Sequence, residues 1–249
     1  MNRHRLPATA ALILGLAVLY VIILLAAVHT VGTDANLYHS EQIKAGILPA
    51  SGLTEEGLRA LDQRLADYLK GDAAALESDP PFSEKEMAHM ADCFRLFALL
   101  RKVVSRLIPW AILLTVCGAY LLQDRRRARL CAWLSPLTVL IPLGLFAAYA
   151  MANFDAAFTL FHKLLFRNDL WLLDPATDLL IRVCPEAMFM HMGIRIFVCS
   201  LTGMLAVPAI AALLTFVWPK GKEDRNTWKT TTRRGPAPKR IDFGNRGTR

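Results

Sequence analysis

Residues 103–152 read VVSRLIPWAILLTVCGAYLL, QDRRRAR and LCAWLSPLTVLIPLGLFAAYAMA, and the predicted architecture starts from them. Two apolar segments flank a short turn that holds four arginines. A helix of roughly 20 mostly apolar residues spans the hydrocarbon core of a bilayer, and positive charges gather in cytoplasmic loops. These residues therefore predict two transmembrane helices, at 103–122 and 130–152, joined by a turn on the cytoplasmic side.

Two further apolar segments, at about 8–28 and 194–218, are also long enough to cross a bilayer. The first follows Arg3 and Arg5, as in a signal peptide, but it exceeds the roughly 7–15 apolar residues of a signal peptide's core. We therefore expect it to remain as an anchor. The chain is 54% hydrophobic, and its apolar residues form unbroken blocks, which disfavours a soluble fold.

The positive charges predict the orientation of the four helices. Lys and Arg gather at the N-terminus, in the turn at 123–129 and after residue 218, and an even number of spans places all three on one side. That side is expected to be the cytoplasm, so both termini lie inside. The net charge of +8 could suggest nucleic acid, but the basic residues border apolar blocks. We therefore expect contact with membrane phospholipid and no binding of nucleic acid.

The predicted fold class is all-α, a polytopic membrane protein with four transmembrane helices and a small helical extracytoplasmic cap. The N-terminal tail and first transmembrane helix occupy 1–30, the cap 31–102, the second and third helices 103–152, an amphipathic extracytoplasmic loop 153–193, the fourth helix 194–218, and a basic tail 219–249. The tail is polar and lacks apolar periodicity, so we expect it to be disordered.

The cap contains two local signals for helices. Leucines 58, 61, 65 and 69 recur at helical spacing after Thr54, and Gly71 is expected to end that helix. The segment from Ser83 to Glu86 is a capping box, in which the serine and glutamate side chains satisfy free backbone donors at a helix start. The helix that follows is expected to run down toward the second transmembrane helix.

The shorter extracytoplasmic loop is unusually apolar. Residues 154–167 form an amphipathic pattern that suits a helix lying in the membrane interface. Asp174 followed by Pro175 is typical of a helix start, because aspartate caps free N–H groups and proline fits the first turn. A second short helix is therefore predicted from Asp174 to just before Pro185.

Neither the cysteines nor the histidines show a metal-binding spacing. The five cysteines include no CxxC pair, and the histidines include no HExxH or similar ligand pair. Cys93 and Cys184 lie on the same predicted side of the membrane, so they could form a bridge, although two free buried thiols are the simpler interpretation.

Two extracytoplasmic histidines, His89 and His162, could carry chemistry. Asp92 lies three residues after His89 on the same helical surface, where a carboxylate can orient an imidazole for general acid–base catalysis. The simpler alternative is that each histidine is a polar anchor at the membrane surface. Likewise, Asp174 and Asp178 could serve only as helix-capping acids, and Asn168 and Trp171 could serve only to end a helix and anchor the loop. Residue patterns alone leave these alternatives open.

The residues from Ser83 to Asp92, SEKEMAHMAD, are followed by FHKLLFRN at 161–168, WLLDP at 171–175, DLLI at 178–181 and PE at 185–186. In this order they resemble the bacterial lipoprotein intramolecular transacylase family, over about residues 58–193. The resemblance implies an acyltransferase of the bacterial cytoplasmic membrane that acts on diacylated lipoproteins. It would move the sn-2 acyl chain of the diacylglyceryl-cysteine to the same cysteine's α-amino group, which yields a lyso-lipoprotein.

The resemblance also implies which residues carry the activity. His89 and His162 match the two histidines on which the family's activity rests, and they would act as a general base and a general acid in either order. We expect His89, oriented by Asp92, to be the base. Asn168 or Trp171 would position the ester, and Asp174 and Asp178 would bind or orient the substrate as well. No cofactor and no metal are required.

Other interpretations remain open at this point. The protein could be a metal-binding membrane enzyme or sensor in which His39 joins His89 and His162 as a ligand. It could also be a non-enzymatic scaffold whose cap binds a partner, or Cys93 or Cys184 could carry the acyl group covalently. A transporter is disfavoured, because the spans hold few ionisable residues away from their ends.

Overall fold

The structure is a computed structural model that describes residues 5–77 and 81–217. The chain divides into a unit up to Ala211 and a C-terminal unit from Ala212, and the first unit is the one discussed below. All regular elements within the described residues are helices, which confirms the all-α prediction. Arg3, Trp218 and the predicted tail at 219–249 lie outside the described residues.

Four helical segments are long and apolar enough to cross a membrane, as predicted. They belong to α1 (Arg5–Gly32), α5 (Glu84–Leu122), the pair α6 (Arg125–Leu134) and α7 (Leu137–Ala152), and α10 (Glu186–Val217). Large apolar side chains point outward from these helices. Val116, Leu121 and Leu145 are each at least 60% exposed, which fits a surface that faces lipid rather than water.

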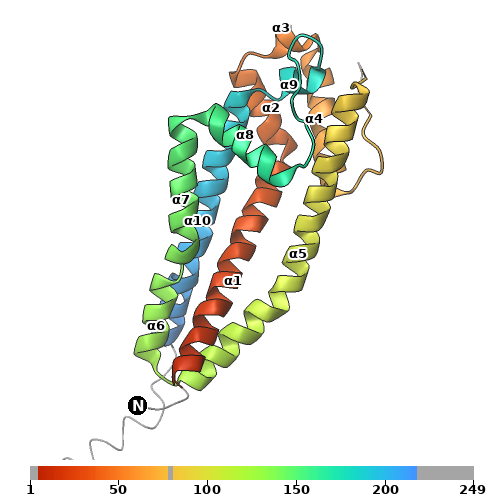
Figure 1. The fold of residues 1–249 in the computed structure, drawn as a ribbon. Helices are drawn as coiled ribbons and strands as arrows, with labels where there is room; N and C mark the ends of the chain where they lie inside the picture. Colours follow the sequence, from red (N-terminus) through yellow and green to blue (C-terminus); the bar gives the residue numbers. More distant parts are fainter. Residues whose placement is uncertain (1–4, 78–80, 218–249) are drawn as a thin grey trace, which may run out of the picture. The chain divides into compact units, whose positions relative to one another are not determined.

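Helices α1 and α5 converge toward the lower end of Figure 1, and their backbones approach closely at two glycines. A Cβ atom added to Gly118 would lie 2.5 Å from the backbone nitrogen of Leu12, and one added to Gly15 would lie 2.5 Å from that of Thr115. The two backbones therefore touch directly. Small residues allow this close packing, which is the main source of attraction between helices in lipid.

The third span differs from the single helix predicted at 130–152. It begins earlier, as α6, and breaks at Ser135 and Pro136 before α7 starts at Leu137. Proline lacks a backbone N–H and its ring clashes with the preceding turn, so it interrupts the helix there. The buried Tyr20 of α1 donates its hydroxyl to the carbonyl of Ala132 at 3.3 Å, next to the break.

The cap consists of α2 (Ala35–Lys44), α3 (Leu48–Ser51), α4 (Glu55–Lys70) and the first half of α5. Helix α4 is the one predicted from its leucines, with Thr54 as its N-cap and Gly71 in the left-handed region at its end. The capping box at Ser83 and Glu86 is also present. Helices α2 and α3 were missed, because α2 is mostly polar and shows no clear apolar stripe in sequence.

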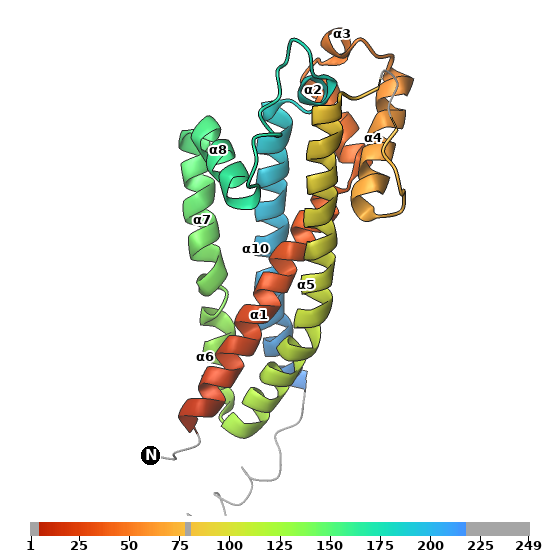
Figure 2. The ribbon, with the colours of Figure 1, turned by 45° about the vertical axis from the view of Figure 1, so that its right-hand side comes forward.

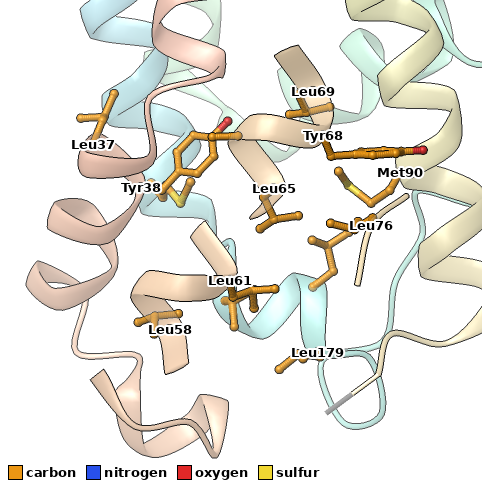
Figure 3. Packing of buried hydrophobic residues seen from close by; sticks show 14 of the residues in the cluster. Leu37, Tyr38, Leu58, Leu61, Leu65, Tyr68, Leu69, Leu76, Met90 and Leu179 are labelled. Atoms are coloured by element: carbon orange, nitrogen blue, oxygen red, sulfur yellow. The ribbon is translucent and has the colours of Figure 1, made fainter. Parts of the chain in front are cut away.

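The core of the cap joins α2, α4, α5 and α9 (Leu179–Val183) in one apolar cluster (Figure 3). Leucines 58, 61 and 65 of α4 pack beside Met90 of α5 and Leu179 of α9. Burial of such side chains contributes roughly 1.5–3 kcal/mol each. The cluster therefore holds the short helix α9 near the first turns of α5, although the two are far apart in sequence.

Helix α5 is continuous, but its two halves differ in character. Residues 84–102 include seven charged side chains, whereas residues 103–122 include a single one, Arg106. We take 103–122 as the membrane-crossing part, as the sequence predicts. His89 and Asp92 therefore belong to the more charged half of the helix.

Helix α7 turns directly into α8 (Phe154–Leu165) without a linker (Figure 2). The backbone N–H of Asn153 donates to the carbonyl of Tyr149 at the end of α7. The side-chain oxygen of Asn153 accepts from the N–H of Ala156 in the first turn of α8 at 3.0 Å. One asparagine thus ends one helix and caps the next, and α8 folds back across the bundle from this corner.

Candidate active site

The structure brings His89 and His162 together. His89 projects from α5 and His162 from α8, and their ring centroids are 6.1 Å apart with an angle of 39° between the planes. Both side chains are buried, with 8% and 7% of their surface exposed. Two imidazoles that are 73 positions apart in sequence therefore share one site.

Aromatic rings enclose His162. Trp171 stacks on its ring at a centroid distance of 4.8 Å, and Phe158 lies at 4.1 Å. The Nδ1 atom of His162 is 2.8 Å from the carbonyl oxygen of Phe158, one turn earlier in α8. Because a carbonyl only accepts hydrogen bonds, Nδ1 must carry the proton. The Nε2 atom of the neutral ring then holds the free lone pair.

His89 lacks the close carbonyl partner that His162 has. Its Nε2 atom lies 3.6 Å from the sulfur of Cys93, and its Nδ1 atom is buried without a hydrogen-bond partner in the described part of the chain. Removal from water disfavours the charged form of an imidazole. Burial, together with the nearby His162, lowers the pKa of His89 to about 4, although the charge of Asp92 opposes the shift.

Burial also lowers the pKa of His162, and the hydrogen bond to the Phe158 carbonyl opposes that shift. Both rings are therefore neutral near pH 7. A neutral imidazole offers one lone pair and one N–H, so this pair can accept a proton at one place and donate a proton at another.

Asp92 does not hydrogen-bond to His89 as the sequence had predicted. Its Oδ2 atom accepts from the side-chain amide of Asn168 at 2.8 Å, and its Oδ1 atom pairs with Arg95 at 2.7 Å. Positions three residues apart point about 60° away from each other around a helix. The carboxylate of Asp92 therefore reaches the loop after α8 instead of the imidazole, and it holds that loop.

This loop places Trp171 against His162. The indole N–H of Trp171 donates to the backbone carbonyl of Asn168 at 3.0 Å, and the side-chain oxygen of Asn168 accepts from the N–H of Leu170. The ammonium group of Lys85, on α5, donates to the carbonyl of Leu172. Trp171 therefore lies against His162, whereas Asn168 contacts Asp92 and the backbone of the loop.

The predicted start of the second loop helix at Asp174 is wrong. Helix α9 begins only at Leu179, and the residues before it form turns. The Asp174 side chain accepts from the N–H of Ala176 at 2.9 Å, and Asp178 accepts from the N–H of Asp174 at 2.8 Å. Aspartate side chains compete with helix hydrogen bonds in this way. The Asp174 carboxylate therefore bonds within the loop, and the Asp178 carboxylate bonds both within the loop and to the Ser83 hydroxyl at 3.5 Å.

Two further residues, Phe166 and Cys93, contact the histidines in ways that the sequence did not predict. The ring of Phe166 lies 5.2 Å from that of His89 and 5.7 Å from that of His162, so it contacts both. Cys93 was considered only as a bridge or an acyl carrier, yet its sulfur contacts His89. His89 and Cys93 are four residues apart, and side chains at this spacing are neighbours on a helix, so their contact could have been predicted from the sequence.

The interpretation as a metal site required His39 to join the other two histidines. In the structure, His39 lies in the cap, with its Nδ1 atom 3.3 Å from Asp62 and its Nε2 atom 3.6 Å from Glu55. Within the described ranges, no group of three or more His, Cys, Asp or Glu side chains is arranged to hold a metal ion.

Comparison with known proteins identifies the fold and the family of the chain. The structure of the lipoprotein intramolecular transacylase Lit from Bacillus cereus is 25% identical and superposes with a TM-score of 0.66, covering 90% of this chain and 98% of that chain. A second structure of that protein, with one histidine replaced by arginine, is 25% identical with a TM-score of 0.68, over 90% and 94% of the two chains. No curated protein sequence matches. The family model for lipoprotein intramolecular transacylase Lit matches residues 12–189, well over half of the chain, so this membrane protein belongs to the Lit family of acyltransferases.

Proposed function

We propose that this protein moves the sn-2 acyl chain of a diacylglyceryl-cysteine to the α-amino group of the same cysteine, at the N-terminus of a lipoprotein. The observation that carries the proposal is the buried pair of neutral imidazoles, His89 and His162, held together by two different helices. The product is an N-acyl, S-monoacylglyceryl lipoprotein. The family of the chain supports the reaction class.

The reaction takes place on the extracytoplasmic face of the bacterial cytoplasmic membrane. The basic turn at 123–129 lies at the opposite end of α5 from His89, and positively charged loops stay in the cytoplasm. The amphipathic helix α8 begins where the membrane span α7 ends, with Leu160 and Leu164 exposed. This arrangement suits a helix in the membrane interface, where the ester of a lipid-anchored substrate lies.

His162 acts as the general base. The hydrogen bond from its Nδ1 to the Phe158 carbonyl leaves the lone pair on Nε2. An α-amino group has a pKa of roughly 7.7–8, so it is partly protonated at neutral pH and needs a base during its attack on an ester. The alternative order, with His89 as the base, loses support, because Asp92 bonds to Asn168 instead of orienting His89.

His89 stabilises the oxyanion and protonates the departing glycerol oxygen. Burial raises the pKa of the Cys93 thiol to about 12, so the thiol keeps its proton and can donate it to Nε2 of His89. The proton of His89 then resides on Nδ1, which is buried and has no hydrogen-bond partner among the described residues. A buried donor without a partner is costly, and the substrate's carbonyl oxygen relieves that cost. Phe166, which contacts both imidazoles, has to shift to admit the ester.

The protons balance without any further group. The amine gives a proton to His162 as the C–N bond forms, and His89 gives a proton to the glycerol oxygen as the ester C–O bond breaks. Proton transfer from His162 to His89 then returns both rings to their neutral starting forms. Because the donor and the acceptor belong to one molecule, holding them in reach removes much of the entropic barrier. Trp171, stacked on His162, supplies the wall against which the ester is held.

The test uses three matched substitutions, His89→Gln, His162→Gln and His191→Gln, in a host that lacks its own N-acylation activity. His191 is a half-exposed histidine of α10 and serves as the control. Each of the first two changes is expected to lower the rate by about 10²–10⁴-fold. Mass spectrometry of a lipoprotein's N-terminal peptide should show the diacylglyceryl form accumulating with these two variants alone. Normal lyso product from both would refute the proposal.

A further inference from the structure

Glu86 is a buried carboxylate that the reaction does not use directly. Only 1% of its side chain is exposed, and no cation pairs with it within residues 5–77 and 81–217. A buried charge is very costly unless hydrogen bonds replace its lost contacts with water. The partners of Glu86 therefore show what the residue does.

Each oxygen of Glu86 caps a different helix. Oε2 accepts from the backbone N–H of Ser83 at 2.7 Å and completes the capping box of α5. Oε1 accepts from the backbone N–H of Leu180 at 2.5 Å, a contact between residues that are 94 positions apart. Leu180 is the second residue of α9, and its N–H has no partner inside that helix.

Within residues 5–77 and 81–217, no other side chain caps helix α9. Its N-cap residue, Asp178, makes no capping hydrogen bond. The carboxylate of Asp178 instead accepts from the N–H of Asp174 at 2.8 Å and from the hydroxyl of Ser83 at 3.5 Å. The start of α9 therefore depends on Glu86.

This contact fixes one end of the loop that carries Trp171. Asn168, near the loop's start, bonds to Asp92, and Leu180, at its end, bonds to Glu86. Both carboxylates belong to α5, one before and one after His89 in the same helix. Trp171 lies between the two fixed points and stacks on His162.

We propose that Glu86 is a positioning residue of the transacylation: by capping α9 from α5, it sets the loop that holds Trp171 on the ring of His162. This inference rests on the function proposed above and adds a residue to it. Glu86 itself does not touch the substrate. A displacement of about 1 Å in a reacting group lowers a rate by as much as 10²-fold, so the effect of losing this cap is visible in kcat.

The test compares Glu86→Gln and Glu86→Ala with Glu84→Gln. Glu84 lies in the same first turn of α5 but is exposed, so its substitution removes the same charge without touching α9. Glutamine has one carbonyl oxygen and can accept from only one of the two N–H groups. We expect kcat to fall about tenfold in Glu86→Gln and about 100-fold in Glu86→Ala, with Glu84→Gln unchanged.

A double-mutant cycle separates positioning from general folding. In the Trp171→Ala background, Glu86→Ala should lower kcat less than about threefold further, because the side chain it positions is already gone. An equal loss in both backgrounds would overturn the proposal, and so would a Glu86→Gln protein with the kcat of Glu84→Gln. If Glu86→Ala does not fold, Glu86→Gln in the two backgrounds gives the same comparison.

His89→Gln and His162→Gln, measured in the same assay, keep the two proposals apart. If both histidine variants retain normal activity, the proposed chemistry fails whatever Glu86 does. If they lose activity while Glu86→Ala and Glu86→Gln match Glu84→Gln, only the positioning role fails.

Discussion

Replacing Gly118 by alanine tests the close crossing of α1 and α5. The new methyl group would lie 2.5 Å from the nitrogen and 2.7 Å from the Cα of Leu12. Both are backbone atoms, so no side-chain rotation relieves the contact. Carbon atoms in good contact lie about 3.5–4.0 Å apart, and the two helices must therefore separate by about 1 Å at the crossing.

The cost of this separation can be estimated. Overpacking of a tight contact typically costs about 1–3 kcal/mol. For a protein of about this size, 1 kcal/mol corresponds to roughly 2–4 °C in the midpoint of thermal unfolding. Gly118→Ala should therefore lower the Tm of the purified protein by roughly 2–12 °C. Alanine's better helix propensity offsets at most about 1 kcal/mol of this cost, so the decrease in Tm should lie below the upper end of that range.

Gly144→Ala is the matched control, because a Cβ on Gly144 meets no atom within 4 Å. This variant should keep or slightly raise the Tm in the same detergent. The measurement is a thermal unfolding curve followed by tryptophan fluorescence, with lyso-lipoprotein formation as a check on folding. Equal Tm values for Gly118→Ala and the unmodified protein would show that the two backbones do not touch.

Two predictions concern pH. With its pKa near 4, His89 remains about 97% neutral at pH 5.5, where an ordinary imidazole of pKa 6.5 is only about 10% neutral. As the pH falls from 9, log kcat should therefore drop with a slope of one through the pKa of the substrate amine, without a second bend at 6.5; a bend at that pH would contradict the neutral pair. In the cap, burial raises the pKa of Asp62 to about 6, so its contribution to stability is complete below pH 4 and is lost as the pH rises through 6. Asp62→Asn should flatten the dependence of Tm on pH between 4 and 6, and an unchanged dependence in the variant would argue against that raised pKa.

The four spans could be predicted from the sequence, because a membrane requires only length and apolar character of a helix. The starts of α4 and α5 could be predicted as well, since Thr54 and Ser83 act within their own first turn. The break at Pro136 could not, because membrane helices tolerate proline where neighbouring groups supply the missing contacts. Whether a proline bends or breaks a span depends on those neighbours, among them Tyr20.

The residues of the candidate site could be singled out in the sequence, but their contacts could not. The order of motifs pointed to His89 and His162, yet only the fold-back of α8 shows that their rings meet. Asp92 was assigned to His89 because local spacing is visible in a sequence, whereas its true partner, Asn168, is 76 positions away. The capping box predicts the contact between Glu86 Oε2 and the N–H of Ser83. The contact between Oε1 and the N–H of Leu180 could not be predicted, because the two residues are 94 positions apart.

The corner at Asn153 couples the direction of α8 to that of α7. Membrane helices adjust to a thinner bilayer by tilting, and the shared cap leaves no flexible chain between α7 and α8 to absorb such a rotation. His162 would move with α8, whereas His89 belongs to a different helix, α5. A change in the tilt of α7 would therefore be expected to change the distance between the two rings.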